Sequence, residues 1–233
     1  MKIVKMAKDG FEYPFGREIW ENGNIWYHGT SSAYTNKIES DGWNPGDLPY
    51  SKSDIEPIVE VYDNIKMATN EDNPILTNCA GTYYQFRDLD SENITVRNTV
   101  SFAWNYWYAR NYSMNKGGEA LSELLSCIDS LSKNWDERNL HSSQINAILE
   151  KQLPVLNRIR KRLESVLELS FPVVYAVELE GISSNHKGVD PYGDFWGFTI
   201  EKKIDVFISQ EKIVGKAFFP DGILTPYYPG FGD

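Results

Sequence analysis

The sequence predicts an α+β fold, with strands and helices in mixed order rather than in strict alternation. Three observations support this prediction: a strand followed by a helix in residues 24–43, helical periodicity over residues 119–170, and a block of short strands after Pro172. Because these last strands follow one another over short connections, they favour antiparallel pairing over a doubly wound sheet. We expect one domain over residues 1–233, with a helical insertion at about 119–170.

The first strand and helix lie in residues 25–42. The run IWYHGT is apolar and aromatic and closes with Gly-Thr, which is typical of a strand that ends in a turn. The next run, SSAYTNKIESDG, begins with capping residues and stops at Gly42, a suitable C-cap, so it predicts a helix. Residues 44–75 are rich in Pro, Asp, Asn and Ser, and we expect mostly loop there, with one short helix near Glu60.

The middle of the chain predicts a second strand and helix and then two long helices. NTVSFAW reads as a strand, and NYWYARNYSM reads as a helix that ends before Gly117 and Gly118. Apolar residues then recur at helical spacing from Leu121 to Leu131 and from Ile145 to Val166, which predicts a helical hairpin. Pro154 should kink the second helix or begin a new one. The run RIRKRLE in this segment is most simply a solvated helix face.

The C-terminal part predicts four strands and one long loop. The strand runs are VVYAVEL, IDVFISQ, KIVGKAFF and ILTPYY, each rich in β-branched or aromatic residues. Between the first two lies SSNHKGVDPYGDFWGF, whose Gly, Asp and aromatic content is typical of a binding or gating loop.

Composition excludes several classes of protein. The net charge of −10 and the low isoelectric point disfavour non-specific binding to nucleic acid or anionic membranes, which depends on Lys and Arg. No stretch is long and apolar enough for a membrane span or a signal peptide, so we expect a cytoplasmic protein with no membrane partner. Cys79 and Cys127 form no CxxC pair, and only three histidines are present, so we expect no metal site.

Familiar catalytic motifs are missing from the sequence. It contains no G-x-S-x-G turn, no G-x-G-x-x-G loop and no Walker-type loop. The residue that stands out is His28, placed between a tyrosine and a Gly-Thr pair. On residue type alone, a histidine among aromatic residues is more often a packed core residue than a catalytic one, and both roles remain open.

Three blocks of the sequence, taken in order, resemble the ADP-ribosyltransferase superfamily in its His-type branch, which includes diphtheria-toxin-like and PARP-like enzymes. WYHGTSSAYTNKIESDGW is similar to the first block, where a strand ends in His-Gly-Thr or His-Gly-Ser, and this identifies His28. SFAWNYWYARNY resembles the second block, with Ser101 at the key position and Tyr112 at the far end of the helix. SQEKIVGKAFFPDGIL resembles the strand that carries the catalytic glutamate before an Ile-Val pair, which identifies Glu211.

The resemblance implies a fold and a reaction. The fold would be a split β-sandwich, two small antiparallel sheets around an NAD cleft, here with the helical hairpin inserted. The reaction would be mono-ADP-ribosyl transfer from NAD to a macromolecular acceptor, with release of nicotinamide and without a metal. Breaking the bond between nicotinamide and ribose develops positive charge on the sugar, and Glu211 would stabilise that charge and help to orient the nucleophile.

The resemblance also implies a set of NAD-binding residues. His28 would donate to a ribose hydroxyl, and the backbone of Gly29 would pair with the nicotinamide carboxamide. The nicotinamide ring would stack on an aromatic side chain of the second block. Tyr112 is the candidate for this stacking role, and Tyr108 and Trp107 compete with it. Thr30 and Ser101 would be supporting hydrogen-bonders.

Departures from the family pattern restrict the activity. Ser101 stands where the chain-building PARP-type enzymes usually have Tyr, so chain elongation is not expected. Ser209 stands two residues before Glu211, where arginine-specific members usually have Glu or Gln, so arginine is not the expected acceptor. Compact members of the superfamily are commonly bacterial toxins or phage host-takeover factors, which is the context that the resemblance implies.

Three alternatives remain open. An NAD glycohydrolase would use water as the acceptor, and an RNA 2′-phosphotransferase-like enzyme would need several basic residues around the 2′-phosphate. A non-catalytic NAD-fold module would bind a partner protein through the helical hairpin. For a transferase, the acidity of the chain favours a protein acceptor slightly over nucleic acid.

Overall fold

The structure is a computed structural model that describes residues 1–45, 52–68, 99–114, 118–132, 143–182, 186–189 and 200–226. The chain divides into two compact units. The first comprises Met1–Asp47, Thr95–Gly118 and Leu169–Asp233, and the second comprises Leu48–Ile94 and Glu119–Glu168. The single domain that the sequence suggests stays a prediction.

The first unit contains one mixed β-sheet and short helices, so the α+β class is confirmed. Its strands are β1 (Lys2–Lys5), β2 (Ile25–Ser31), β3 (Val100–Ala103), β4 (Pro172–Glu178), β5 (His186–Val189), β6 (Ile200–Ile204) and β7 (Ile213–Phe218). Its helices are α1 (Arg17–Trp20), α2 (Thr35–Asp41) and α5 (Tyr106–Tyr112), with single 3₁₀ turns η1 (Ser32–Tyr34) and η3 (Gln210–Lys212).

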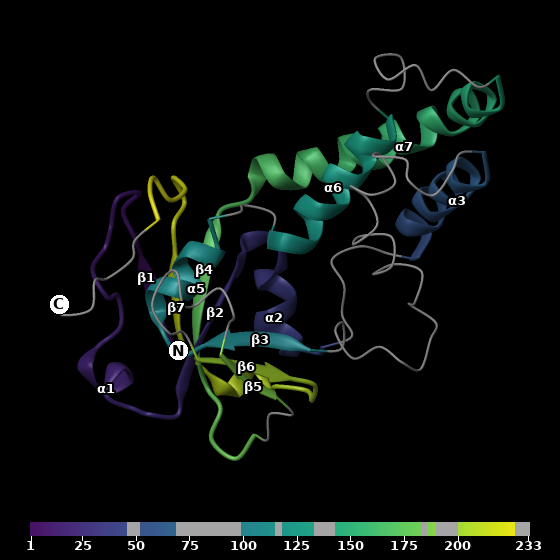
Figure 1. Cartoon of the computed structure of the whole chain (residues 1–233). Helices are drawn as coiled ribbons and strands as arrows, with labels where there is room; N and C mark the ends of the chain where they lie inside the picture. Colours follow the sequence, from purple (N-terminus) through teal and green to yellow (C-terminus); the bar gives the residue numbers. More distant parts are fainter. Residues whose placement is uncertain are drawn as a thin grey trace. The chain divides into compact units, whose positions relative to one another are not determined.

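The strands follow the order β1-β7-β4-β2-β3-β6-β5. β1 pairs with β7 in parallel, and every other pair in this order is antiparallel. Only one registered pair, Tyr27 with Ala103, joins β2 to β3, whereas β2 and β4 pair along their full lengths. In Figure 1, β4 and β7 run up the view while β3 and β6 run across it, so the sheet changes direction at the β2–β3 junction.

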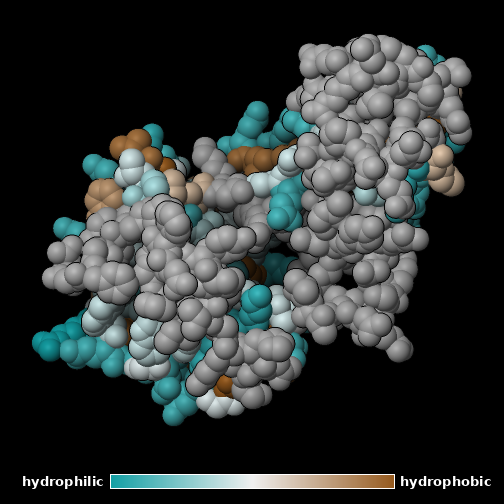
Figure 2. Space-filling view, in the orientation of Figure 1, coloured by the Kyte–Doolittle hydropathy of each residue, from teal (hydrophilic) through white to brown (hydrophobic). Residues whose placement is uncertain are grey.

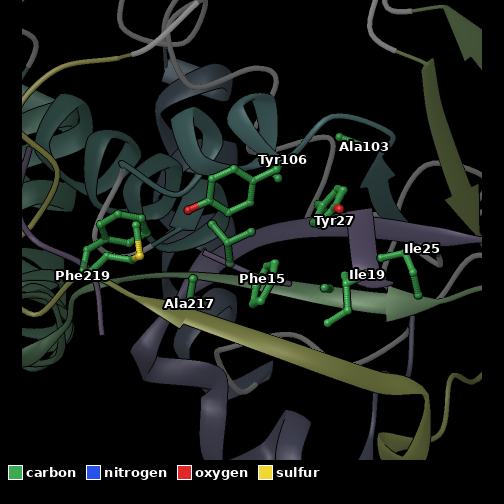
Figure 3. Packing of buried hydrophobic residues seen from close by; sticks show 12 residues of the cluster. Phe15, Ile19, Ile25, Tyr27, Ala103, Tyr106, Ala217 and Phe219 are labelled. Atoms are coloured by element: carbon green, nitrogen blue, oxygen red, sulfur yellow. The ribbon is translucent and has the colours of Figure 1, made fainter. Parts of the chain in front are cut away.

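Both faces of the sheet are covered, as the alternation along β4 shows. Val174 and Ala176 point to one face, where they pack with α5 and the aromatic segment before α1. Tyr175 and Val177 point to the other face, where α2 packs. The first cluster, drawn in Figure 3, includes Phe15, Ile19, Ile25, Tyr27, Ala103, Tyr106, Ala217 and Phe219. The second includes Trp26, Ile38, Trp43, Phe102, Ile204, Ile208 and Ile213.

The helices α2 and α5 confirm two predictions from the sequence. Asn105 caps α5, since its side-chain oxygen accepts a hydrogen bond from the backbone N–H of Trp107 at 2.8 Å. η1 and α2 together occupy the segment predicted as the first helix, and α2 ends at Gly42. Gly42 has φ of +84°, a backbone conformation that favours glycine and explains why the helix stops there.

The second unit is helical, with α3 (Lys52–Ala68), α6 (Gly118–Ser132) and α7 (Ser143–Leu169). Both long helices predicted after Gly117 are present, and α7 is not divided at Pro154. α3 is much longer than the short helix expected near Glu60. Its buried residues Ile55, Ile58, Val61, Tyr62 and Ile65 follow helical spacing that the polar composition of the segment obscures.

Polar contacts join the helices of the second unit. Gln152 of α7 donates to Glu60 of α3 at 2.9 Å, and Arg160 of α7 pairs with Asp129 of α6. Cys127 is buried in α6 as a thiol, while Cys79 lies outside the described residues. The arginine of RIRKRLE at position 160 therefore has a structural partner within this unit.

Several strand predictions were wrong. IDVFISQ does not form one strand, because β6 ends at Ile204 and Ile208 makes only an isolated bridge with Trp43. The described part of ILTPYY, residues 223–226, is not a strand. The predicted loop contains β5, which pairs with β6, while its aromatic residues Phe195, Trp196 and Phe198 lie outside the described residues. β1 and α1 were not predicted.

None of the helices in the described ranges combines the length and apolar character needed to cross a membrane. The cytoplasmic location stays a prediction. Figure 2 shows small apolar groups between polar areas on the face in view.

Candidate functional site

His28 lies in β2 at the point where β2 and β3 separate. Its half-buried ring packs against Trp43 and Phe102, with ring centroids at 5.8 and 5.4 Å. Its Nδ1 lies 2.8 Å from the backbone carbonyl oxygen of Ser101 in β3. A carbonyl oxygen only accepts hydrogen bonds, so Nδ1 must bear the proton and act as the donor.

The protonation of His28 follows from its surroundings. Burial lowers the pKa of the imidazole, and the hydrogen bond to the Ser101 carbonyl opposes this only in part, so the ring favours its neutral form. With the proton on Nδ1, the neutral ring presents Nε2 as an acceptor. The expected role is thereby altered, since the neutral ring would accept a hydrogen bond from a ribose hydroxyl rather than donate one.

Nε2 of His28 has no hydrogen-bond partner among the described residues. The ring makes one hydrogen bond within the described residues, through Nδ1, and Nε2 is not among the fully buried atoms that lack a partner.

Gly29 has a structural role in packing. A Cβ at position 29 would lie 1.9 Å from the carbonyl oxygen of Ala109 and 3.1 Å from the backbone N of Ser113. α5 thus rests directly on the backbone of β2, which only glycine permits. This packing alone accounts for a glycine at position 29, so no bound ligand is needed to explain it. Pairing of the Gly29 backbone with the nicotinamide carboxamide stays a prediction.

The two candidate stacking tyrosines belong to α5. Tyr112 is 53% exposed at the end of the helix, and Tyr108 is half-buried, with their ring centroids 5.9 Å apart. α5 packs on the face of β2 to which Gly29 points, whereas the His28 ring packs in the cluster on the other face. His28 and the two tyrosines therefore lie towards opposite faces of β2, and no described contact joins them.

Thr30 and Ser101, the two predicted supporting residues, lie in β2 and β3. Thr30 is buried in β2 opposite Val173 of β4. Ser101 is half-buried in β3 opposite Lys203 of β6, and its main-chain carbonyl, not its hydroxyl, contacts His28. Their predicted role as supporting hydrogen-bonders to NAD stays a prediction.

Glu211 lies in η3, the 3₁₀ turn immediately before β7, and not within a strand. Ser209 caps this turn, its hydroxyl accepting from the Glu211 backbone N–H at 3.3 Å. The Glu211 side chain is exposed and makes no hydrogen bond or ion pair in the described ranges. No described contact joins Glu211 to His28 or to Tyr112, so their meeting at one ligand stays a prediction.

Trp43 connects the surroundings of His28 to the segment that precedes Glu211. Its backbone exchanges two hydrogen bonds of 2.9 Å with Ile208, while its ring packs on His28. Its indole Nε1 is buried and has no hydrogen-bond partner. No local pattern in the sequence could have identified this residue, because its role depends on pairing with a distant segment.

A polar cluster next to His28 was also missed. His28, Tyr175 and Lys216 lie side by side in one cross-strand row of β2, β4 and β7. The carboxylate of Glu39 in α2 accepts from the Tyr175 hydroxyl at 2.7 Å and pairs with Lys216. Burial raises the pKa of Glu39, but the bonds from Lys216 and Tyr175 outweigh it, so the pKa is lowered. Burial and the Glu39 charge raise the pKa of Tyr175.

No group of three or more His, Cys, Asp or Glu side chains in the described ranges is placed to hold a metal ion. No family model, curated protein or solved structure matches the chain.

Proposed function

We propose that the protein is an NAD-dependent mono-ADP-ribosyltransferase that modifies a macromolecular acceptor and releases nicotinamide. The main support is the hydrogen bond between His28 and Ser101. These residues come from the first and second blocks of the family resemblance, and they meet at the opening between β2 and β3. Residues far apart in the sequence are thus neighbours where an NAD cleft would be expected.

The arrangement of the sheet also supports this proposal. The single registered pair between β2 and β3 is the narrowest junction of the seven-stranded sheet, with β1, β7, β4 and β2 on one side of it and β3, β6 and β5 on the other. A split β-sandwich would divide at such a junction. The cleft would then lie there, beside the Nε2 atom of His28.

The residues would act as follows. Nε2 of neutral His28 would accept a hydrogen bond from a ribose hydroxyl and so orient the sugar. The exposed carboxylate of Glu211 would stabilise the positive charge that develops on the ribose as nicotinamide leaves. Glu211 would have to reach the ribose from η3. A protein acceptor is favoured over nucleic acid because the chain is acidic.

One observation favours a second candidate, the non-catalytic module. Tyr108 and Tyr112 belong to the helix on one face of β2, whereas the His28 ring lies on the other face. The residues expected to stack on nicotinamide and to bind the ribose therefore do not point towards one ligand. A module that binds a partner would not need them to do so.

The test is incubation of the wild type and Glu211→Gln with labelled NAD and a cell extract, followed by protease or nuclease treatment. Glu180→Gln is the matched control, since Glu180 is also an exposed carboxylate in a turn. Wild type and control should label a protease-sensitive product and release nicotinamide, and Glu211→Gln should do neither. Nicotinamide release without label would indicate a glycohydrolase. Equal labelling by Glu211→Gln would refute the proposed mechanism, and inactivity of the wild type would favour the module.

A further inference from the structure

Arg110 of α5 is a fully buried cation without a carboxylate partner. Its side chain is 0% exposed. Nη1 donates to the Thr225 carbonyl oxygen at 3.1 Å and to the Asn111 side chain at 3.4 Å, whereas Nε and Nη2 are buried and have no hydrogen-bond partner. No Asp or Glu of the described ranges pairs with it. An uncompensated buried charge is strongly unfavourable, so this arrangement needs a cause.

The free atoms of Arg110 form a specific shape. Nε and Nη2 lie on the same edge of the planar guanidinium, and their N–H groups point in parallel. That edge is the fork that binds two oxygens of a phosphate or carboxylate at once. Nη1 already donates to the Thr225 carbonyl oxygen. The remaining edge, formed by Nε and Nη2, is the one suited to bind an oxyanion through two oxygens.

A further unused donor lies in the same helix. Tyr106 precedes Arg110 by one helical turn, is fully buried, and its hydroxyl also lacks a hydrogen-bond partner. The two side chains are close enough to interact electrostatically. Figure 3 shows the Tyr106 hydroxyl directed towards Phe219, whose ring centroid lies 5.6 Å from Cζ of Arg110. The hydroxyl thus points towards a ring that the guanidinium also contacts.

The aromatic neighbours of Arg110 do not satisfy its free edge. Phe11 and Phe219 lie within 5.1 and 5.6 Å of Cζ, so their rings stabilise the positive charge through their faces. Ring faces do not accept the in-plane hydrogen bonds of Nε and Nη2 in the way that oxygens do. A water molecule could accept such a bond, but it would leave the charge uncompensated.

We propose that Arg110 and Tyr106 bind a phosphate group, with two oxygens on the Arg110 fork and a third oxygen on the Tyr106 hydroxyl. The third donor favours phosphate over carboxylate, because the fork alone already occupies both oxygens of a carboxylate. The group could be free phosphate or part of a nucleotide.

Access to this site requires movement of its cover. Phe11, whose ring lies 5.1 Å from Cζ of Arg110, is 40% exposed, and Thr225, which binds Nη1, is also exposed. A ligand that reaches the free edge of Arg110 would have to displace part of this cover.

This phosphate site is separate from Glu211. Phe219 directly follows the last residue of β7, whereas Glu211 precedes the first. The six residues of β7 span about 20 Å at the rise of an extended strand. The inference therefore does not depend on the proposed transferase activity.

The test measures the melting temperature of the full chain against inorganic phosphate, a nucleoside monophosphate and NAD, with chloride at equal ionic strength as the reference. The wild type should show a saturable increase with at least one phosphate source. Arg110→Met should lose that increase, and Tyr106→Phe should weaken the affinity by roughly tenfold or more. A response to nucleotide but not to inorganic phosphate would identify a nucleotide as the ligand.

Two controls complete the test. Arg17→Met, at an exposed arginine paired with Glu21, should keep the full response. Glu211→Gln should also keep it, even if transferase activity fails. NMR of the guanidinium Nε–H of Arg110 in the wild type provides a measurement that does not depend on variants folding, and its resonance should shift on phosphate addition. An unchanged resonance, or an equal response in Arg110→Met, would overturn the proposal.

Discussion

Gly29 and Ala109 approach so closely that no side chain fits between them. A Cβ built on Gly29 in β2 would lie 1.9 Å from the carbonyl oxygen of Ala109 in α5. This contact fixes how near the helix after β3 comes to β2. It therefore determines where the predicted tyrosines of α5 stand with respect to His28.

Gly29→Ala should destabilise the first unit by about 3 kcal/mol, because either α5 or β2 must move to admit the methyl group. Urea unfolding monitored by near-UV circular dichroism would measure this. Gly23→Ala is the control, since its nearest neighbour would be the Trp104 side chain at 3.9 Å, an ordinary contact, and it should change stability little. Equal effects of the two substitutions would contradict the packing described.

The pKa of His28 predicts a dependence of stability on pH. Since burial lowers this pKa below 6.5 in the folded state, the unfolded chain binds a proton between the folded pKa and 6.5 while the folded chain does not. The contribution of His28 to the free energy of unfolding should thus rise with pH through this interval and change no further above it. The comparison is with His28→Gln, which lacks the contribution, by urea titrations between pH 5 and 8. A difference between the two proteins that does not vary with pH would show that His28 has an ordinary pKa.

The hydroxyl of Tyr175 should contribute about 2 kcal/mol to stability at pH 7, the usual range for a hydrogen bond to a charged group. Tyr175→Phe removes the bond to Glu39 and leaves the buried ring in place. Because the pKa of Glu39 is lowered on folding, its stabilising effect is present above 4.5 and is lost as the pH falls through its folded pKa. The difference between wild type and Tyr175→Phe should therefore shrink in acid. In a Glu39→Gln background it should be smaller at pH 7 as well, and an unchanged difference would exclude this origin.

The elements that the sequence predicted correctly are those marked by residues close together in the chain. The capping residue Asn105 and the C-terminal Gly42 delimit α5 and α2, and helical spacing identifies α6 and α7. The order of the strands depends on pairings between distant segments, so β1 beside β7 could not be foreseen. α3 was underestimated because Pro57 and acidic residues interrupt its apolar spacing. The contacts of Trp43 are likewise non-local, since they depend on the segment that bridges β6 and β7.

Trp43 should determine both the stability of this face of the sheet and the behaviour of His28. Trp43→Ala removes ring contacts with His28, Phe102 and Tyr175 and should cost about 4 kcal/mol. Trp43→Phe keeps an aromatic ring and removes an indole N–H that is buried without a partner, so it should cost much less.

The pKa of His28 in Trp43 variants shows whether Trp43 positions the imidazole or only fills space in the core. If Trp43 holds the imidazole in its buried place, the pKa of His28 in Trp43→Ala should move back towards 6.5, while in Trp43→Phe it should stay lowered. NMR titration of the His28 ring in the two variants measures this directly. Trp20→Ala is the control, because Trp20 is exposed and its described ring contacts are with Tyr13 and Trp107. A His28 pKa that is the same in all three proteins would mean that the bond to Ser101 alone positions the ring, since that bond is common to them.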